Sequence, residues 1–176
     1  MIIKDKTTIL TIVTYGILLS TASILINDIR EFDLQQFQKF QTWAKSVDKN
    51  ESWFASKNAI KWSYYVISAG LFFWKAYLIY SFTYFISILN EINKGNYFTN
   101  KNINYFKKIG NIFILYTINV LVLRFLMATI GKSTFNFFTE FKEEFTLLIP
   151  CGLAFYILAE LFKRAKETKE ENELTI

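Results

Sequence analysis

The chain has 176 residues, of which 52% are hydrophobic, with a single cysteine and no histidine. This composition excludes a disulfide framework, a His/Cys metal site and a Cys–His or Ser–His nucleophile pair within the chain. The net charge of +5 would suggest nucleic acid as the partner of a soluble protein. The apolar residues, however, are distributed as in a membrane protein, so neither direct nucleic-acid binding nor a cofactor is expected.

Four segments of the chain are almost free of charge. Each has roughly the 20 residues that a helix needs to cross a hydrocarbon core about 30 Å thick. They are residues 7–27, 62–90, 109–130 and 145–162. None shows the polar face that every helix of a water-soluble bundle needs. The pattern therefore predicts an all-α integral membrane protein, a four-helix antiparallel bundle that forms one domain over residues 1–176.

The first segment has a second interpretation, as a secretory signal. Lys4 and Lys6 precede it, and small residues that resemble a cleavage site lie near Ala22. The apolar stretch continues through residues 24–26, beyond that site, which favours a retained membrane span.

Four spans place both termini, a central loop (91–108) and a tail (163–176) on one side of the membrane. Two other loops, 28–61 and 131–144, lie on the opposite side. The first side carries the higher density of lysine and arginine close to the membrane ends. By the positive-inside rule, the protein is predicted to lie in the cytoplasmic membrane with both termini in the cytoplasm. Anionic lipids at that face are expected partners of its lysines.

The first outer loop contains a predicted amphipathic helix. Its apolar residues recur at steps of three to five: Ile29, Phe32, Phe37, Phe40, Ala44 and Val47. Such a helix is expected to lie on the outer membrane surface or to cap the bundle. A ligand-binding lid is the alternative. The second outer loop is predicted to form a shorter interfacial element.

Two basic residues within the spans are candidate functional sites, because an ionisable group in the membrane is costly and is seldom kept without a role. Lys75 lies near the middle of the second segment, on the face away from its small and hydroxyl-bearing residues. That face is either covered by another helix or subunit, or the lysine extends to the interface. Arg124 shares an inward face with Thr117, and its expected partners are backbone carbonyls or Asp28.

Glu160 is the third charged candidate and has two interpretations. Lys163 and Arg164 follow at i+3 and i+4, so a local ion pair is the simpler one. The alternative is an ion pair with Lys75 across the bundle. Earlier in the same span, Pro150 and the glycine at 152 predict a bend.

The central loop reads as a turn followed by a helix start. Lys94-Gly95-Asn96 form the turn, and Thr99 is a good N-cap, so the third helix is predicted to begin near residue 100. Lys107 and Lys108 lie on the polar side of its first part, where they can meet lipid phosphates.

The C-terminal tail is predicted to be a helix that projects from the membrane. Lysines and glutamates alternate at i, i+4 from Lys163 to Glu173, which stabilises a solvated helix. Leu174 and Ile176 add two apolar groups to a polar end. The tail is therefore either frayed, as many chain ends are, or docks on the 94–108 segment or on a partner protein.

Two segments carry a resemblance to a known family. The first is Lys-Gly at 94–95, Phe-Thr at 98–99, Asn102, a basic pair and Ile-Gly at 109–110. The second is Leu-Ala-Glu-Leu-Phe-Lys-Arg at 158–164, followed by an acidic run to Ile176. The chain resembles the DUF2975-like family of bacterial four-helix membrane proteins. This resemblance implies no established activity, and it implies a membrane-bound partner of a small helix-turn-helix regulator.

Taken together, these patterns predict a non-catalytic membrane anchor or regulatory partner rather than an enzyme. Its candidate docking surface for a soluble cytoplasmic protein comprises Gly95, Phe98, Thr99, Asn102, Lys107, Lys108, Gly110, Glu173, Leu174, Thr175 and Ile176. The alternative is a small transporter or channel subunit that uses Lys75, Arg124 or Glu160. A homo-oligomer is compatible with either function.

Overall fold

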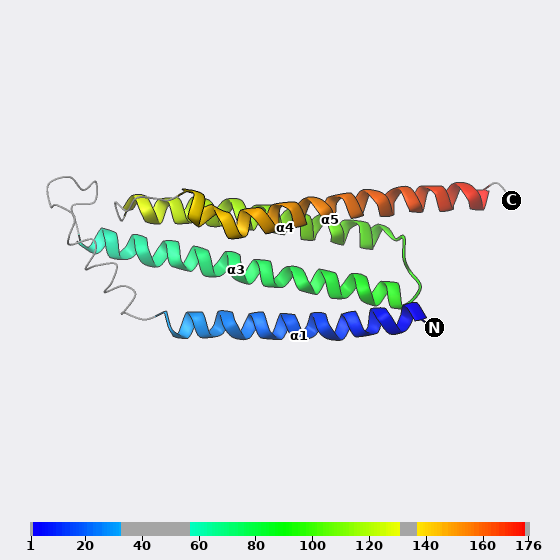
Figure 1. The fold of residues 1–176 in the computed structure, drawn as a ribbon, viewed down its shortest axis with the longest axis horizontal. Helices are drawn as coiled ribbons and strands as arrows, with labels where there is room; N and C mark the ends of the chain where they lie inside the picture. Colours follow the sequence, from blue (N-terminus) through cyan, green and yellow to red (C-terminus); the bar gives the residue numbers. More distant parts are fainter. Residues whose placement is uncertain (1, 33–56, 131–136, 175–176) are drawn as a thin grey trace.

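The computed structural model describes residues 2–32, 57–130 and 137–174, which form four α-helices (Figure 1). They are α1 (Ile2–Arg30), α3 (Lys57–Asn93), α4 (Asn100–Ile130) and α5 (Phe137–Leu174). Each contains a stretch long and apolar enough to cross a membrane. The predicted all-α, four-span architecture is therefore confirmed. The predicted amphipathic helix of the first outer loop falls largely on residues 33–56, outside the described part.

The helices are longer than the charge-free segments. α3 begins at Lys57 rather than near residue 62, and α5 begins at Phe137, inside the predicted second outer loop. α5 then continues through Pro150 to Leu174 as one helix, so the tail is helical as predicted. The absence of charge marks the part of a helix that meets hydrocarbon, whereas the backbone hydrogen bonds continue into the polar regions on either side.

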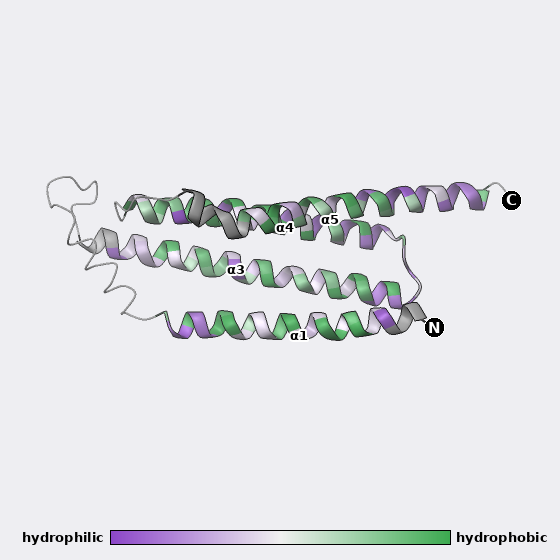
Figure 2. Cartoon of the chain, in the orientation of Figure 1, coloured by the Kyte–Doolittle hydropathy of each residue, from purple (hydrophilic) through white to green (hydrophobic). Residues whose placement is uncertain are grey.

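Most of the apolar surface of these helices faces outward. Large hydrophobic side chains are exposed along all four, for example Ile9 at 62%, Phe73 at 64% and Ile157 at 62%. Figure 2 shows hydrophobic residues along the length of the helices and hydrophilic ones gathered toward the C-terminal end of α5. A surface of this kind is stable against lipid and not against water, and it identifies a multi-pass membrane protein.

The helices lie in an open row rather than a closed ring. α1 packs on α3, α3 on α4, and α4 on α5, and α1 has no comparable interface with α5 among the described residues. Both chain ends and the connector between α3 and α4 lie at one end of the molecule, here called the termini end (Figure 1). The row therefore ends in α1 on one side and in α5 on the other, with α3 and α4 between them.

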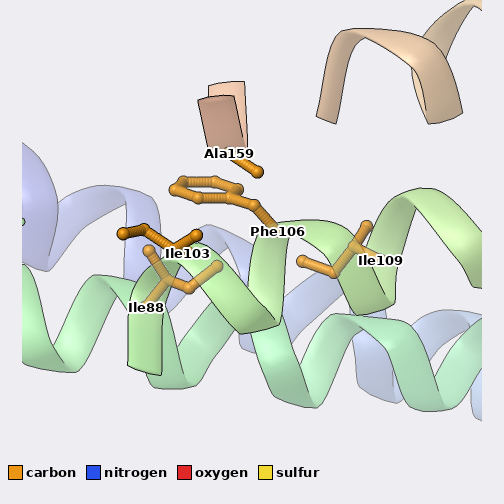
Figure 3. Packing of buried hydrophobic residues seen from close by; sticks show 5 residues of the cluster. All are labelled: Ile88, Ile103, Phe106, Ile109 and Ala159. Atoms are coloured by element: carbon orange, nitrogen blue, oxygen red, sulfur yellow. The ribbon is translucent and has the colours of Figure 1, made fainter. Parts of the chain in front are cut away.

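The hydrophobic core lies toward the termini end. Figure 3 shows its five most buried members, which come from three helices: Ile88, Ile103, Phe106, Ile109 and Ala159. Two further rings pack against this cluster from α5, with centroids 6.1 Å (Phe155) and 4.9 Å (Phe162) from that of Phe106. The contacts join α3, α4 and α5 at the level where the predicted docking surface begins.

α4 and α5 approach each other most closely at a pair of glycines. A Cβ added to Gly110 would lie 2.8 Å from the backbone oxygen of Gly152, and one added to Gly152 would lie 3.1 Å from that of Gly110. Small residues allow such backbone contact between membrane helices. Gly152, interpreted above as part of a bend, therefore serves helix packing.

α1 contacts α3 through one narrow seam. Its buried and half-buried side chains recur at alternating steps of four and three residues, as in a coiled coil. The seam consists of Thr7, Thr11, Thr14, Leu18, Thr21, Leu25 and Asp28. Almost every other side chain described on α1 is exposed, so among the described helices this one packs through its seam with α3.

Candidate functional site

Lys75 lies between α1 and α3, where it forms an ion pair with Asp28. The two side chains are 39% and 40% exposed. One expectation for Lys75 is that another helix covers its face. The structure agrees with this expectation, and the covering helix is α1. Asp28, proposed above as a partner of Arg124, is occupied by this lysine.

The seam between α1 and α3 is closed by a polar contact at each end. Near the termini end, the Thr7 hydroxyl donates a hydrogen bond to the Asn93 side-chain oxygen. The Asp28–Lys75 pair lies at the other end, about 31 Å along α1 at about 1.5 Å per residue. That distance matches the thickness of a hydrocarbon core. Relative to α1, Lys75 therefore lies at the edge of the charge-free segment rather than in the middle of a span.

Glu160 forms the local ion pair. Its Oε1 lies 3.4 Å from Nε of Arg164, on the exposed side of α5. Lys163 instead pairs with Glu167, at 3.8 Å. Lys75 is paired with Asp28 at the α1–α3 seam and Glu160 with Arg164 on the exposed side of α5, so the alternative pairing across the bundle is not formed.

Arg124 is half-buried in the last third of α4. Its neighbour Leu123 packs at Gly70, where an added Cβ would lie 3.1 Å from Cδ1 of the leucine. Lys75 and Glu160 are paired with Asp28 and Arg164, so the three charged candidates do not form one polar cluster.

The connector between α3 and α4 begins with a Schellman turn. The amide of Gly95 donates to the carbonyl of Ile92 at 2.9 Å, and the amide of Asn96 donates to that of Glu91 at 2.9 Å. Gly95 has a φ of 87°, in the left-handed region that glycine adopts without strain. The predicted turn at 94–96 is confirmed, and its chemistry explains why α3 ends at Asn93.

Glu91 ties this turn to the start of α4. One of its carboxylate oxygens lies 2.8 Å from Nζ of Lys101, and the other accepts from the Asn96 side chain at 3.1 Å. Lys94 approaches the same carboxylate at 3.8 Å. The charges of Lys94 and Lys101, two basic residues of the central loop, are thereby partly neutralised by Glu91.

The start of α4 is capped as predicted. The Thr99 hydroxyl accepts from the amide of Asn102 at 3.2 Å, and the Thr99 carbonyl accepts from that of Ile103 at 3.1 Å. The side-chain amide of Asn102 in turn donates to the carbonyls of Asn96 and Tyr97, each at 2.8 Å. These bonds hold the connector in one conformation.

Two residues of the predicted docking surface are buried inside the protein. Asn102 is 0% exposed, and Gly110 lies against α5. A soluble partner cannot reach either of them, and this part of the prediction is wrong. The residue types at these two positions are needed for loop closure and helix packing. A single sequence does not distinguish such structural residues from residues that bind a partner.

The connector and α5 form one continuous surface at the termini end. The Phe98 ring packs edge-on to that of Phe162, with centroids 5.4 Å apart. Lys166 donates from Nζ to the side-chain oxygen of Asn100 at 3.0 Å. Phe98 nevertheless remains 40% exposed and accessible from outside. The base of the tail therefore contacts the 94–108 segment through Lys166, while its end remains exposed.

The last two turns of α5 are exposed to their surroundings. All described side chains from Glu167 to Leu174 are exposed, and Leu174 is 88% exposed. In Figure 1 this part of α5 extends beyond the ends of the other helices. Ion pairs at i, i+4 join Lys166 to Glu170 and Lys169 to Glu173. Thr175 and Ile176 lie outside the described residues.

Lys107 and Lys108 are both exposed on α4. The Lys108 ammonium lies 5.1 Å from the centroid of the Tyr84 ring and 5.9 Å from that of Tyr105. Such cation–π contacts favour a lysine that must remain charged beside apolar helices. Lys108 is therefore positioned by aromatic rings, and Lys107 extends from the same turn of the helix.

The comparisons with known proteins agree with this architecture and supply no activity. A family model described as "Protein of unknown function (DUF2975)" matches residues 50–176. The chain belongs to this family. No curated protein and no solved structure matches it. The resemblance noted in the two sequence segments is confirmed, since the matched range includes the connector, the buried glycine pair and the whole of α5.

Proposed function

We propose that this DUF2975 protein is a non-catalytic membrane anchor or regulatory partner that presents a surface to a soluble cytoplasmic protein. The surface comprises the exposed part of the connector, from Gly95 to Thr99, and the projecting end of α5. Both termini are cytoplasmic in this proposal, as the distribution of basic residues suggests.

The observation that carries this proposal is the contrast between the base of the surface and its tip. The base is held by the capped, hydrogen-bonded connector and by Phe98 against Phe162. Beyond Lys166, α5 remains helical while its described side chains are all exposed. A rigid base that supports a solvated, charged helix is an arrangement suited to recognition by another protein.

The alternative, a transporter or channel subunit, has less support. Such a protein needs polar groups along a shared path between helices. Lys75 lies at the α1–α3 seam, whereas Glu160 is on the outward side of α5 and is paired locally. The two groups belong to different surfaces, which favours the anchor.

The test is site-specific photo-crosslinking in native membranes. A photoreactive amino acid at Leu174 is expected to capture a soluble protein, because this side chain is 88% exposed at the tip of the tail. The matched control is the same substitution at Leu153, which is 51% exposed on the apolar part of α5. Truncation after Glu171 should abolish a capture made from Phe98.

The same adducts from both positions, or an unchanged capture after truncation, would contradict the proposal. Solute or ion flux in liposomes that is lost in Glu160→Gln would instead support the transporter.

A further inference from the structure

The face of α1 opposite its seam carries a second regular stripe. Its residues also recur at steps of four and three, and all are exposed. They are Ile9, Val13, Gly16, Ser20, Ser23 and Asn27. The stripe runs about 27 Å along the helix at about 1.5 Å per residue, nearly the thickness of the hydrocarbon core. α1 is thus two-sided, although the described part of the chain covers only one side.

Gly16 makes no close packing contact with the described residues. A Cβ added there would have no atom within 4 Å, whereas Gly110 and Gly152 leave no room for one. Glycine in the middle of a helix lowers its stability relative to alanine. A glycine at position 16 is explained if the backbone of a helix from outside the chain packs against it, as at small-residue contacts between membrane helices.

A second, independent observation concerns the hydrogen bonds of the polar side chains of the stripe among the described residues. The seam threonines donate to carbonyls of their own helix, Thr11 to Thr7 at 2.8 Å and Thr14 to Leu10 at 2.7 Å. No side-chain hydrogen bond of Ser20, Ser23 or Asn27 occurs within the described part of the chain. Lipid chains cannot supply a partner for the two serine hydroxyls, which lie inside the charge-free segment.

We propose that this stripe packs against the same stripe of a second copy, with the two α1 helices parallel about a two-fold axis normal to the membrane. Copies inserted in the same orientation bring each residue of the stripe to the level of its own counterpart. A carboxamide is both donor and acceptor, so Asn27 is complementary to itself. Gly16 and Ser20 allow the two backbones to approach.

The order of the helices also favours a second copy over the chain's own helices. α1 is an edge helix, and α4 and α5 lie on the far side of α3. Closing the row would require one of them to leave the core around Ile88 and Phe106. A second copy covers the stripe without disturbing any contact inside the chain.

The test is disulfide crosslinking of the full-length protein in membranes. Cys151 is first replaced by alanine, since it is the chain's single cysteine. Ser20→Cys then places a thiol in the stripe. The matched control is Leu19→Cys, which lies at nearly the same depth and is 66% exposed, but points about 100° away around the helix.

Mild oxidation should give at least about fivefold more covalent dimer from Ser20→Cys, because disulfide geometry demands Cα atoms within about 7 Å. Equal yields, or none from Ser20→Cys, would overturn the proposal.

A second measurement does not depend on cysteine chemistry. Fluorescently labelled protein in lipid bilayers at low density should show two-step photobleaching, and Gly16→Leu or Asn27→Leu should shift it to one-step bleaching. Ile17→Leu, a conservative change outside the stripe, should leave the dimer intact. These side chains point away from the α3 seam, so the variants should accumulate normally. One-step bleaching of the unmodified protein, or a dimer fraction unaffected by Gly16→Leu, would refute the second copy.

Discussion

The ion pair between Asp28 and Lys75 lies where the charge-free segment of α1 ends. Its two side chains are about two-fifths exposed, and they face lipid or its interface rather than open water. Screening by water is weaker there than at the surface of a soluble protein, so a carboxylate left without its ammonium partner is poorly solvated. The pair is therefore expected to fasten α1 to α3.

Asp28→Asn or Lys75→Met should each lower the free energy of unfolding by about 2 kcal/mol, between the values for exposed and buried pairs. Denaturant titration in mixed micelles measures this change. The charge-reversed pair Asp28→Lys with Lys75→Asp should recover most of the loss.

Glu160→Gln serves as the control for that experiment, because its exposed local pair with Arg164 is worth less than about 0.5 kcal/mol. Recovery of a Lys75→Glu variant by Glu160→Lys would contradict the pairing described here.

Asn102 is the second residue with a structural role. Replacement by alanine leaves the carbonyls of Asn96 and Tyr97 without their donor in a part-buried site, and we expect a loss of about 1–2 kcal/mol. The connector should also become sensitive to protease. Asn104→Ala, at an exposed position on the same turn, should change neither property. Equal effects of the two substitutions would argue against the loop-closing role.

At the scale of the helices, the glycine contact decides how closely α4 and α5 pack. Gly110→Ala and Gly152→Ala each place a methyl group within about 3 Å of a backbone oxygen that cannot move alone. We expect each to destabilise the protein by about 1–3 kcal/mol, as overpacking generally does. Thermal unfolding in detergent measures the loss.

Gly70→Ala is the matched control for these glycines. Its methyl group meets the flexible end of Leu123, which can rotate aside, so a smaller loss is expected. A larger loss at Gly70 would show that the α3–α4 contact, and not the glycine pair, limits the packing.

At the scale of the whole molecule, the row of helices brings both chain ends and the connector to one end. This arrangement predicts the labelling pattern of cysteines introduced into a Cys151→Ala background. Asn96→Cys and Leu174→Cys should react with a membrane-impermeant maleimide from the same side, and Thr129→Cys, at the far end of α4, from the opposite side. Spheroplasts and inverted vesicles distinguish the two sides. Labelling of positions 96 and 174 from different sides would be incompatible with this topology.

Much of the local structure could be predicted because it depends on neighbouring residues. The capping hydroxyl at Thr99, the left-handed turn at Gly95 and the alternating charges from Lys163 to Glu173 act within a few residues of chain. The structure agrees with each of them. Glu160 also forms the local ion pair that its sequence neighbours predict, because Arg164 is one turn away on the same helix.

The partner of Lys75 and the purposes of Asn102 and Gly152 could not be predicted in this way. A charge, an amide or a missing Cβ looks the same in the sequence whether it serves packing or binding. The threonine seam was present at its regular spacing, yet spacing alone does not reveal which helix lies beside it.

The sequence alone was enough to establish four membrane helices, their order and the turn chemistry between α3 and α4. Hydrophobic length and local hydrogen bonding act along one stretch of chain, and a bilayer leaves few alternatives to a helix. Only the tertiary structure showed that the helices form an open row, that Asp28 is the partner of Lys75 and that Gly110 faces Gly152. Lipid solvates any apolar face equally well, so the choice of neighbour rests on close packing and a few polar contacts between residues far apart in the chain.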